Sequence, residues 1–312
     1  MKFLITGANG FIGSHLVQYL LQQNHSITAI VHRNSNFISS LKGDVKIVCG
    51  DLLDSAFVNM QAVKSDPDII YHLAAQSLPQ VAWQDPAHTF KTNLFSSLIL
   101  FEAARQQGAR PLIVTVSSSS VYAPGNKGQL LSETDSVLPG SIYAASKLAM
   151  ENLAGNFIES IGLKIIIARP FFIIGPRKKG DVSSDFARGI ARIERGEKDD
   201  LSVGNLNNIR DFLDVHDAVS ALWKIAIQGK PGSIYNICSG YGHTVGDLLA
   251  VFKKNARREF TIVNDPDKAR RIDDPFKTGD PAKLSALGWK PQIGLDNSVI
   301  SILDYWRAQN TN

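Results

Sequence analysis

A tyrosine and a lysine four residues apart, preceded by a cluster of serines, form the stretch of this sequence best suited to acid/base chemistry. Residues 116–122 read VSSSSVY, and residues 143–147 read YAASK. On a helix, Tyr143 and Lys147 would share one face. A nearby ammonium lowers the pKa of a phenol from its usual value of about 10, so the pair is a candidate acid/base device. The pattern is short, and an ordinary helix after a serine-rich loop fits it equally well.

A glycine-rich stretch near the start of the chain predicts a dinucleotide site. Residues 6–13 read TGANGFIG, directly after an apolar strand and at the start of a helical pattern. A helix N-terminus that glycine backbone approaches closely binds a pyrophosphate, and the alternative is a glycine turn with no ligand. The expected cofactor-binding residues of this loop are Gly7, Asn9, Gly10, Phe11, Ile12 and Gly13.

The residue after the second strand predicts which cofactor binds. At this place, about 20 residues beyond the glycines, a carboxylate would bind the ribose of NAD and an arginine the phosphate of NADP. The residue here is Arg33. We therefore predict NADP(H) in preference to NAD, with Arg33 on the 2′-phosphate; a surface arginine without this role is the alternative. The ends of the next two strands add Asp51, Leu52, Leu73, Ala74 and Ala75 to the expected cofactor site, to which Tyr143 and Lys147 are also assigned. Asp51 would accept a hydrogen bond from the adenine amino group.

The elements that would position these residues alternate along the first half of the chain. Apolar, β-rich runs fall at residues 3–5, 27–31, 45–48, 69–73, 112–116 and 164–168. Amphipathic helical segments fall at residues 11–22, 57–64, 86–107 and 142–160. Continuous apolar strands that alternate with helices predict an α/β fold with a Rossmann-type, doubly wound parallel sheet.

After residue 170 the elements become shorter, and glycines, prolines and charges interrupt them. Helices are expected at residues 183–195, 215–227 and 244–254, with two short ones within 281–306, and strands at 201–203, 210–213 and 233–237. We expect a smaller C-terminal substrate-binding lobe entwined with the sheet. The predicted division assigns residues 1–171 and 211–237 to the NADP-binding Rossmann domain, and residues 172–210 and 238–312 to the substrate-binding lobe.

Composition excludes several classes of function. The 312 residues are 44% hydrophobic and 20% charged, which is ordinary for a globular protein with a sizeable core. No apolar run approaches the ~20 residues of a membrane span, and the first residues lack a signal-peptide pattern. We therefore expect a cytoplasmic protein with no membrane partner. The net charge of +4 is small and dispersed, which argues against nucleic acid. Without a zinc motif, no metal site is expected.

Taken together, these motifs are similar to those of a known family. The glycine loop, the strand ends, Ser118, the Tyr143/Lys147 pair and Arg169 resemble the extended short-chain dehydrogenases that modify nucleotide sugars. Segments of the second half are similar to GDP-mannose dehydratases and GDP-6-deoxy-4-keto-D-mannose reductases, especially the reductases: residues 184–187, 203–206, 210–215 and 235–240. The resemblance also implies a homodimer formed through the helices at residues 86–107 and 142–160.

The resemblance implies a role for each residue of the serine, tyrosine and lysine group. Ser118, Tyr143 and Lys147 would form the catalytic triad. Lys147 would bond the nicotinamide ribose and lower the pKa of Tyr143, while Ser118 would hold the sugar oxygen.

The substrate side follows from the same resemblance. Arg210 and Arg270 would bind the substrate diphosphate, although a structural ion pair is the alternative for each. Asp273 would face the nucleoside ribose. The expected substrate-binding residues are Ser77, Ser119, Ser120, Phe172, Asn205, Arg210, Arg270 and Asp273.

Two departures from the family pattern bear on the reaction. The dehydratases carry a glutamate two positions before the tyrosine that ends the serine-rich stretch, and this chain has Ser120 there. A hydroxyl cannot readily take a carbon-bound proton, so dehydration is disfavoured. Phe172 and Ile173 stand where relatives place an Asn-His pair, which leaves the exact sugar open.

The predicted activity is NADPH-dependent reduction of a GDP-linked 4-keto-6-deoxyhexose. The product would be GDP-D-rhamnose or a similar sugar, and the partner would be a GDP-sugar or another nucleotide sugar. One alternative is a nucleotide-sugar 4-epimerase that uses tightly bound NAD. The other is a non-catalytic dinucleotide-binding sensor or scaffold, against which the intact Ser118, Tyr143 and Lys147 argue.

Overall fold

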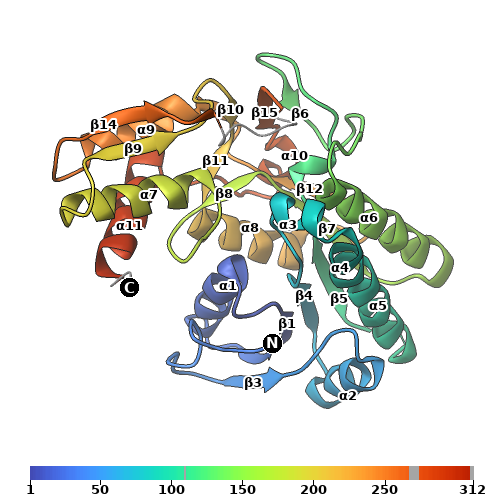
Figure 1. Cartoon of the computed structure of the whole chain (residues 1–312). Coiled ribbons are helices and arrows are strands. Elements are labelled where there is room, and N and C mark those ends of the chain that lie inside the picture. The colour runs from blue at the N-terminus through green and yellow to red at the C-terminus, as the bar shows by residue number, and fades with distance from the viewer. Residues whose placement is uncertain (109, 267–273, 310–312) are drawn as a thin grey trace.

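A seven-stranded parallel sheet forms the centre of the molecule (Figure 1). The structure is a computed structural model that describes residues 1–108, 110–266 and 274–309. In spatial order, the strands are β12 (Ile234–Ile237), β7 (Ile165–Pro170), β5 (Leu112–Val116), β4 (Ile69–His72), β1 (Lys2–Thr6), β2 (Ser26–Val31) and β3 (Val45–Cys49). The chain order reverses between β1 and β4, and open α/β sheets bind ligands beyond the carboxyl ends of strands at such a point.

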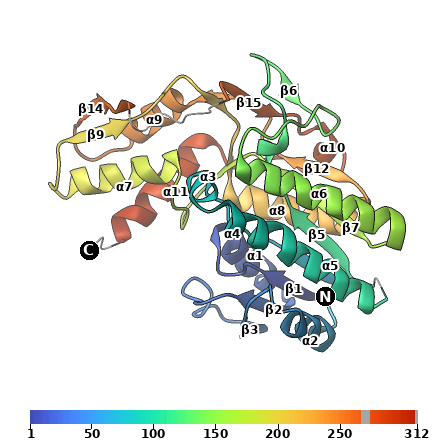
Figure 2. The same cartoon turned by 45° about the vertical axis from the view of Figure 1, so that its right-hand side comes forward.

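Helices cover both faces of this sheet, as the sequence predicted. The helices α1 (Phe11–Leu21) and α8 (Val215–Gln228) share a core with one face, and α2 (Ser55–Ser65), α5 (Ser96–Gln106) and α6 (Ile142–Ile161) with the other. Side chains of β1 alternate between the two cores, because successive residues of a strand point to opposite faces. Phe3 and Ile5 pack toward α1, and Leu4 packs toward α5. Figure 2 shows α5 and α6 side by side along the outside of the sheet.

The helix expected at residues 86–107 is broken. It consists of α4 (Pro86–Phe90), the π turn η1 (Lys91–Phe95) and α5, and α3 (Pro79–Gln84) precedes it. In the π turn the Ser96 N–H bonds to the Lys91 carbonyl, five residues back instead of four. The Ser97 hydroxyl then donates to the Asn93 carbonyl at 2.8 Å. Serine side chains that back-bond in this way compete with regular helix geometry, and π turns of this kind often mark functional sites.

The second half of the chain builds smaller sheets. One has the order β13 (His243–Thr244), β10 (Ile209–Arg210), β15 (Phe276–Gly279) and β6 (Leu130–Leu131). Two others pair β8 (Phe172–Ile174) with β11 (Phe212–Asp214), and β9 (Asp200–Val203) with β14 (Thr261–Asn264). Besides α8, the helices of this half are α7 (Val182–Glu194), α9 (Val245–Lys254), α10 (Ala282–Ser285) and α11 (Leu295–Ala308). A separate apolar core joins α7, α9 and α11. No helix in the described ranges has both the length and the apolar character to cross a membrane.

The single strand expected at residues 210–213 is wrong, because Asp211 divides it between two sheets. Its buried carboxylate accepts hydrogen bonds from the backbone N–H groups of Ser239, Gly240 and Gly279. A buried carboxylate needs such donors, and here they come from two other segments. The chain therefore leaves one sheet at Arg210 and enters the next after Asp211.

Candidate active site

Close backbone packing shapes the glycine loop between β1 and α1. Gly7 has φ of 66°, and a Cβ added to it would lie 2.7 Å from the Ala74 backbone nitrogen. A Cβ added to Gly13 would lie 2.2 Å from the Gly7 carbonyl oxygen. Gly10 directly precedes α1, whose first turn carries no acidic residue. The helix N-terminus therefore keeps the positive end of its dipole for an anion such as a pyrophosphate.

The expected cofactor residue Asn9 ties the glycine loop to the segment that follows β2. Its side-chain oxygen accepts from the Phe37 N–H at 2.8 Å, and its amide nitrogen donates to the Asn34 side chain. Arg33 is exposed at the carboxyl end of β2, next to this segment. Asn9 thus holds the arginine-bearing segment beside the glycine loop.

The other expected cofactor residues also lie at the carboxyl ends of strands. Asp51 and Leu52 follow β3, and the exposed Asp51 carboxylate accepts from the Leu53 N–H at 2.9 Å. Leu73, Ala74 and Ala75 follow β4 and are partly buried, as are Phe11 and Ile12 at the start of α1.

Ser118 and Tyr143 lie near each other, close enough that Ser118 affects the pKa of the tyrosine. Ser118 follows β5, is 9% exposed, and its hydroxyl oxygen accepts from the Ser120 N–H at 3.1 Å. Tyr143 lies in the first turn of α6, which begins there because the Ser141 hydroxyl caps the Ala144 N–H. Burial raises the pKa of Tyr143, and the Ser118 side chain opposes this rise. The phenol therefore keeps its proton at neutral pH in this structure, which suits an acid. The lowering of this pKa by Lys147 stays a prediction.

Lys147 lies one turn after Tyr143 and is only 5% exposed. Its ammonium donates to the Val116 carbonyl at 2.8 Å. Burial lowers the pKa of Lys147 to about 8, and the Glu151 carboxylate, one further turn along α6, acts to raise it. Glu151 is held by Arg169 of β7 through two hydrogen bonds of 2.9 and 2.6 Å. Sequence reasoning missed Glu151, although its spacing of four from Lys147 was a usable signal.

Arg210 and Phe172 lie against each other on the expected substrate side. The Arg210 guanidinium carbon is 5.0 Å from the centre of the Phe172 ring, and the side chain also donates to the Ile209 carbonyl at 2.8 Å. Beside Arg210, in the next strand, the buried Lys277 pairs with Asp274 at 2.5 Å. Lys277 is a second cation at this place that sequence reasoning missed.

The remaining expected substrate residues differ in how exposed they are and in what they contact. Ser120 is partly buried and lies 3.2 Å from Ser118, while Ser119 is buried. Ser77 is exposed after β4. Asn205 is exposed, and its side-chain oxygen accepts from the Asn207 N–H at 2.9 Å, so it shapes its own turn. Arg270 and Asp273 lie outside the described residues.

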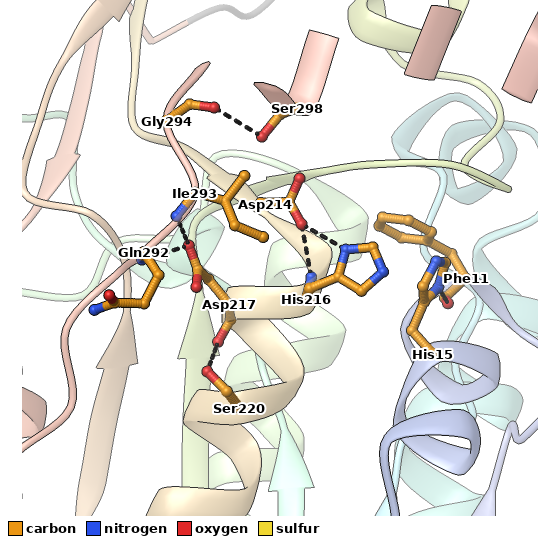
Figure 3. Close-up of polar contacts among 10 residues, drawn as sticks. All are labelled: Phe11, His15, Asp214, His216, Asp217, Ser220, Gln292, Ile293, Gly294 and Ser298. Carbon is orange, nitrogen blue, oxygen red and sulfur yellow. Dashed lines mark hydrogen bonds and ion pairs between the residues drawn. The ribbon is translucent and has the colours of Figure 1, made fainter. Parts of the chain in front are cut away.

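Figure 3 shows where α1, the helix after the glycine loop, packs against α8. The buried His15 ring bonds through Nδ1 to the Phe11 carbonyl at 2.9 Å and lies 5.2 Å from the His216 ring, nearly perpendicular to it. His216 Nδ1 is 2.8 Å from the Asp214 carboxylate. Burial is the main reason why the pKa of His15 falls to about 4. The base of the cofactor helix therefore contains a neutral histidine.

The same view shows the next turn of α8 reaching the C-terminal segment. The Asp217 carboxylate accepts from the Gln292 and Ile293 N–H groups at 3.0 and 2.9 Å. The Ser220 hydroxyl accepts from the Trp289 indole at 2.9 Å. These contacts fix α8, and with it the support of α1, to residues near the end of the chain.

Known proteins and one protein-family model match this chain over nearly its whole length. Residues 4–302 match the sequence model of the GDP-mannose 4,6 dehydratase family. The chain belongs to this family. GDP-6-deoxy-D-mannose reductase of Pseudomonas aeruginosa is 33% identical to it, over 99% of this chain and 98% of that protein. The family resemblance inferred from the motifs is thereby confirmed.

Solved structures of similar proteins confirm the Rossmann-type fold of this member of the family. RMD from Pseudomonas aeruginosa, complexed with NADPH, superposes with a TM-score of 0.84 at 31% identity, with 99% of both chains covered. UDP-glucose 4-epimerase from Thermus thermophilus, in complex with NAD, has a TM-score of 0.89 at 29% identity, with 99% of both chains covered. Reductase and epimerase thus share this backbone, and side chains must distinguish their reactions.

Proposed function

We propose that the protein is an NADPH-dependent oxidoreductase that reduces a GDP-linked 4-keto-6-deoxyhexose. The reaction would convert GDP-4-keto-6-deoxy-D-mannose to GDP-D-rhamnose or a similar sugar. The observation that carries the proposal is the placement of Ser118 at the carboxyl end of β5 near Tyr143 in the first turn of α6, with Lys147 one turn after the tyrosine. The 33% identity to a GDP-6-deoxy-D-mannose reductase supports the same substrate class.

The residues fit this cofactor. The cradle formed by Gly7 and Gly13 has no room for side chains and suits the close approach of a pyrophosphate. Arg33 would hold the 2′-phosphate, and Lys147 would bond the nicotinamide ribose. When bound, NADPH supplies the hydride that reaches C4 of the sugar.

Side chains of the protein supply the proton for this reduction. The Tyr143 hydroxyl donates its proton to the C4 oxygen as charge develops there, and the Ser118 hydroxyl holds the same oxygen. Proton transfer from a positioned acid contributes about 10²- to 10⁴-fold to the rate. The charged Lys147 stabilises the phenolate that remains, and Glu151 favours the charged form of the lysine.

Ser120 distinguishes reduction from dehydration. Its backbone N–H and its hydroxyl both contact Ser118, so it supports the serine instead of presenting a carboxylate to the sugar. Elimination of water requires a base that removes a carbon-bound proton, and Ser120 supplies no such base at this position.

The domain division and the assembly are part of the same proposal. Residues 1–171 and 211–237 form the cofactor domain, supported by the place of β12 at the edge of the large sheet. Residues 172–210 and 238–312 form the substrate lobe, supported by the core shared by α7, α9 and α11. A homodimer would pair the faces of α5 and α6, next to which the Phe95 ring is 51% exposed.

A 4-epimerase is the second candidate, favoured by the TM-score of 0.89 to the NAD-bound epimerase of Thermus thermophilus. Incubation of the purified protein with NADPH and GDP-4-keto-6-deoxy-D-mannose separates the two. A reductase oxidises NADPH in proportion to the GDP-6-deoxyhexose formed. An epimerase purifies with NAD, interconverts nucleotide hexoses that differ at C4, and consumes no NADPH. Binding of NADPH without turnover of either substrate type would instead support a sensor or scaffold.

A further inference from the structure

A line of buried polar side chains starts at the glycine loop and crosses the sheet. The Thr6 hydroxyl, at the end of β1, lies 2.8 Å from His72 Nδ1, at the end of β4. His72 Nε2 lies 2.9 Å from the Ser97 hydroxyl of α5. None of the three residues is more than 3% exposed. The proposed catalytic steps use none of these groups.

The line continues through the π turn to the first turn of α6. The Ser97 hydroxyl donates to the Asn93 carbonyl at 2.8 Å, and the Asn93 side-chain amide donates to the Ser146 hydroxyl at 2.9 Å. Ser146 in turn donates to the Tyr143 carbonyl at 2.7 Å. Asn93 and Ser146 are 1% and 0% exposed. The last bond of the line thus reaches the backbone of the proposed acid itself.

The hydrogen bonds determine which nitrogen of His72 carries the proton. A serine hydroxyl has one proton, and Ser97 donates it to the Asn93 carbonyl, so Ser97 must accept from His72 Nε2–H. The Thr6 hydroxyl accepts from the Ala74 N–H at 3.3 Å and is left to donate to the bare Nδ1. Every donor then has an acceptor, and all bonds run in one direction.

Burial supports the neutral state of this ring. Desolvation first, and then the positive charge of Lys147, lower the pKa of His72 to about 3. A buried imidazolium would also need a negative charge to compensate its own, and the groups at its two nitrogens, Thr6 and Ser97, are neutral hydroxyls.

The cofactor end of the line holds two loops together. Thr6 directly precedes Gly7, and its hydroxyl binds the Ala74 N–H, against which Gly7 packs. The Asn93 side chain clamps the same segment further along, since it accepts from the Gln76 N–H at 2.7 Å and donates to the Gln76 carbonyl at 3.0 Å. Displacement of His72 would therefore disturb the spacing between these loops and α6.

We infer that His72 is a positioning residue, whose neutral, Nε2-protonated ring places Tyr143 relative to the glycine loop through Ser97, Asn93 and Ser146. The kinetic part of this inference rests on the proposed reductase function. The tautomer does not, because it is a property of the protein without substrate.

The tautomer is measured by nitrogen NMR of protein labelled with ¹⁵N-histidine, with the His72 signals assigned by their loss in His72→Gln. We expect a protonated Nε2 and a bare Nδ1 that do not change between pH 5 and 8. A protonated Nδ1, or a ring that titrates in this range, would overturn the inference even if the enzyme proves to be a reductase.

Two matched substitutions test the positioning role. In His72→Gln the amide nitrogen reaches the place of Nε2 and keeps the donor to Ser97. In His72→Asn only the acceptor for Thr6 is kept. Because a displacement of about 1 Å can cost up to about 10²-fold, we expect His72→Asn to lower kcat roughly tenfold. Its KM for the sugar and its Kd for NADPH should stay within about twofold, and His72→Gln should restore most of kcat.

Ser97→Ala is a second variant, which keeps the histidine and removes the hydroxyl that accepts from it and donates to the Asn93 carbonyl. It should also lower kcat without changing the Kd for NADPH. Loss of melting temperature with unchanged kcat in the soluble variants, or equal loss of kcat in His72→Gln and His72→Asn, would show that His72 is only structural. Absence of turnover in the unmodified protein would instead refute the proposed reductase, and the NMR result would still decide the tautomer.

Discussion

Backbone packing shapes the cofactor side of the candidate active site, whereas contacts between side chains shape its substrate side. On the cofactor side, backbone meets backbone: Gly7 packs on the segment after β4, and Gly13 leaves no space next to the Gly7 carbonyl. On the substrate side, side chains meet: Arg210 stacks on Phe172, next to the buried Lys277. A site made of backbone tolerates few substitutions, whereas one made of side chains changes with each. Since a reductase and an epimerase both match this fold, we expect side chains to set which reaction each performs.

Tyr143, where the two sides meet, should show the largest effect. Tyr143→Phe removes the proposed acid and should lower kcat by about 10²- to 10⁴-fold. The Kd for NADPH, measured by its fluorescence, should stay unchanged because the glycine loop is untouched. Tyr122→Phe is a matched control, since that hydroxyl bonds to Asn236 at 2.7 Å within the protein. Near-normal turnover of Tyr143→Phe would mean that another group donates the proton.

Arg210→Lys tests the side-chain half of the comparison. Lysine keeps the charge but loses the planar fork, and hydrogen bonds to charged groups are worth about 1.5–3 kcal/mol. We expect the KM for the nucleotide sugar to rise by roughly tenfold to a hundredfold, with the Kd for NADPH unchanged. Arg188→Lys is the control, because Arg188 also lies over an aromatic ring, that of Trp306, at 5.3 Å. Equal effects of both substitutions would contradict a substrate role for Arg210.

His15 makes the stability of the cofactor helix depend on pH. Its pKa is lowered from 6.5 to about 4 in the folded protein. Between these values the unfolded chain binds more protons, so stability falls as the pH falls, by up to about 1.4 kcal/mol per pH unit. His15→Asn should flatten this slope in urea titrations from pH 6.5 to 4, and the exposed His88→Asn should not. An unchanged slope in His15→Asn would show that His15 is charged when folded.

Gly13→Ala tests the backbone half. The new methyl group would meet the Gly7 carbonyl, so α1 or the loop must shift, at about 1–3 kcal/mol. NADPH binding should weaken in the same variant, while Gly155→Ala serves as the control. A Cβ added to Gly155 in α6 meets nothing within 4 Å, and alanine there should stabilise by about 0.5–1 kcal/mol. If Gly13→Ala binds NADPH normally, the cofactor does not use this loop.

Arg33 should show the smallest effect, because its proposed contact with the 2′-phosphate lies at an exposed side chain. Arg33→Ala should reduce the preference for NADPH over NADH by roughly tenfold, as expected for the loss of an exposed charged contact. The loss should shrink at high salt. Lys42→Ala removes an exposed charge beside the C-terminal part of α1 and should leave the preference intact. A preference for NADH in the unmodified protein would refute the assignment of Arg33.

The contrast between backbone packing and side-chain contacts also determines what the sequence could predict. The glycine loop and the strands of the large sheet follow local rules, and β5 was predicted at its observed bounds, Leu112–Val116. The strand at residues 210–213 was wrong, because the partners of Asp211 come from segments far along the chain. The π turn is accompanied by bonds from the Ser96 and Ser97 hydroxyls to backbone carbonyls, which a helical pattern does not reveal.

Side-chain networks were the least predictable part of the site. Glu151 stood at a visible spacing from Lys147, but its partner Arg169 is brought to it by the sheet. In the sequence His72 lies within the apolar strand predicted at residues 69–73, and its role emerges only when α5 supplies Ser97. Contacts between elements, more than the elements themselves, set these positions.

The most direct test of the proposed reaction uses NADPH that carries deuterium at the transferable position of the nicotinamide. The substrate is GDP-4-keto-6-deoxy-D-mannose, and the product is examined by NMR and mass spectrometry. We predict one deuterium at C4 of a GDP-6-deoxyhexose, with one NADP formed for each product molecule. A product without deuterium, or a changed sugar with no NADPH consumed, would contradict the reductase and favour an enzyme that recycles its own bound cofactor.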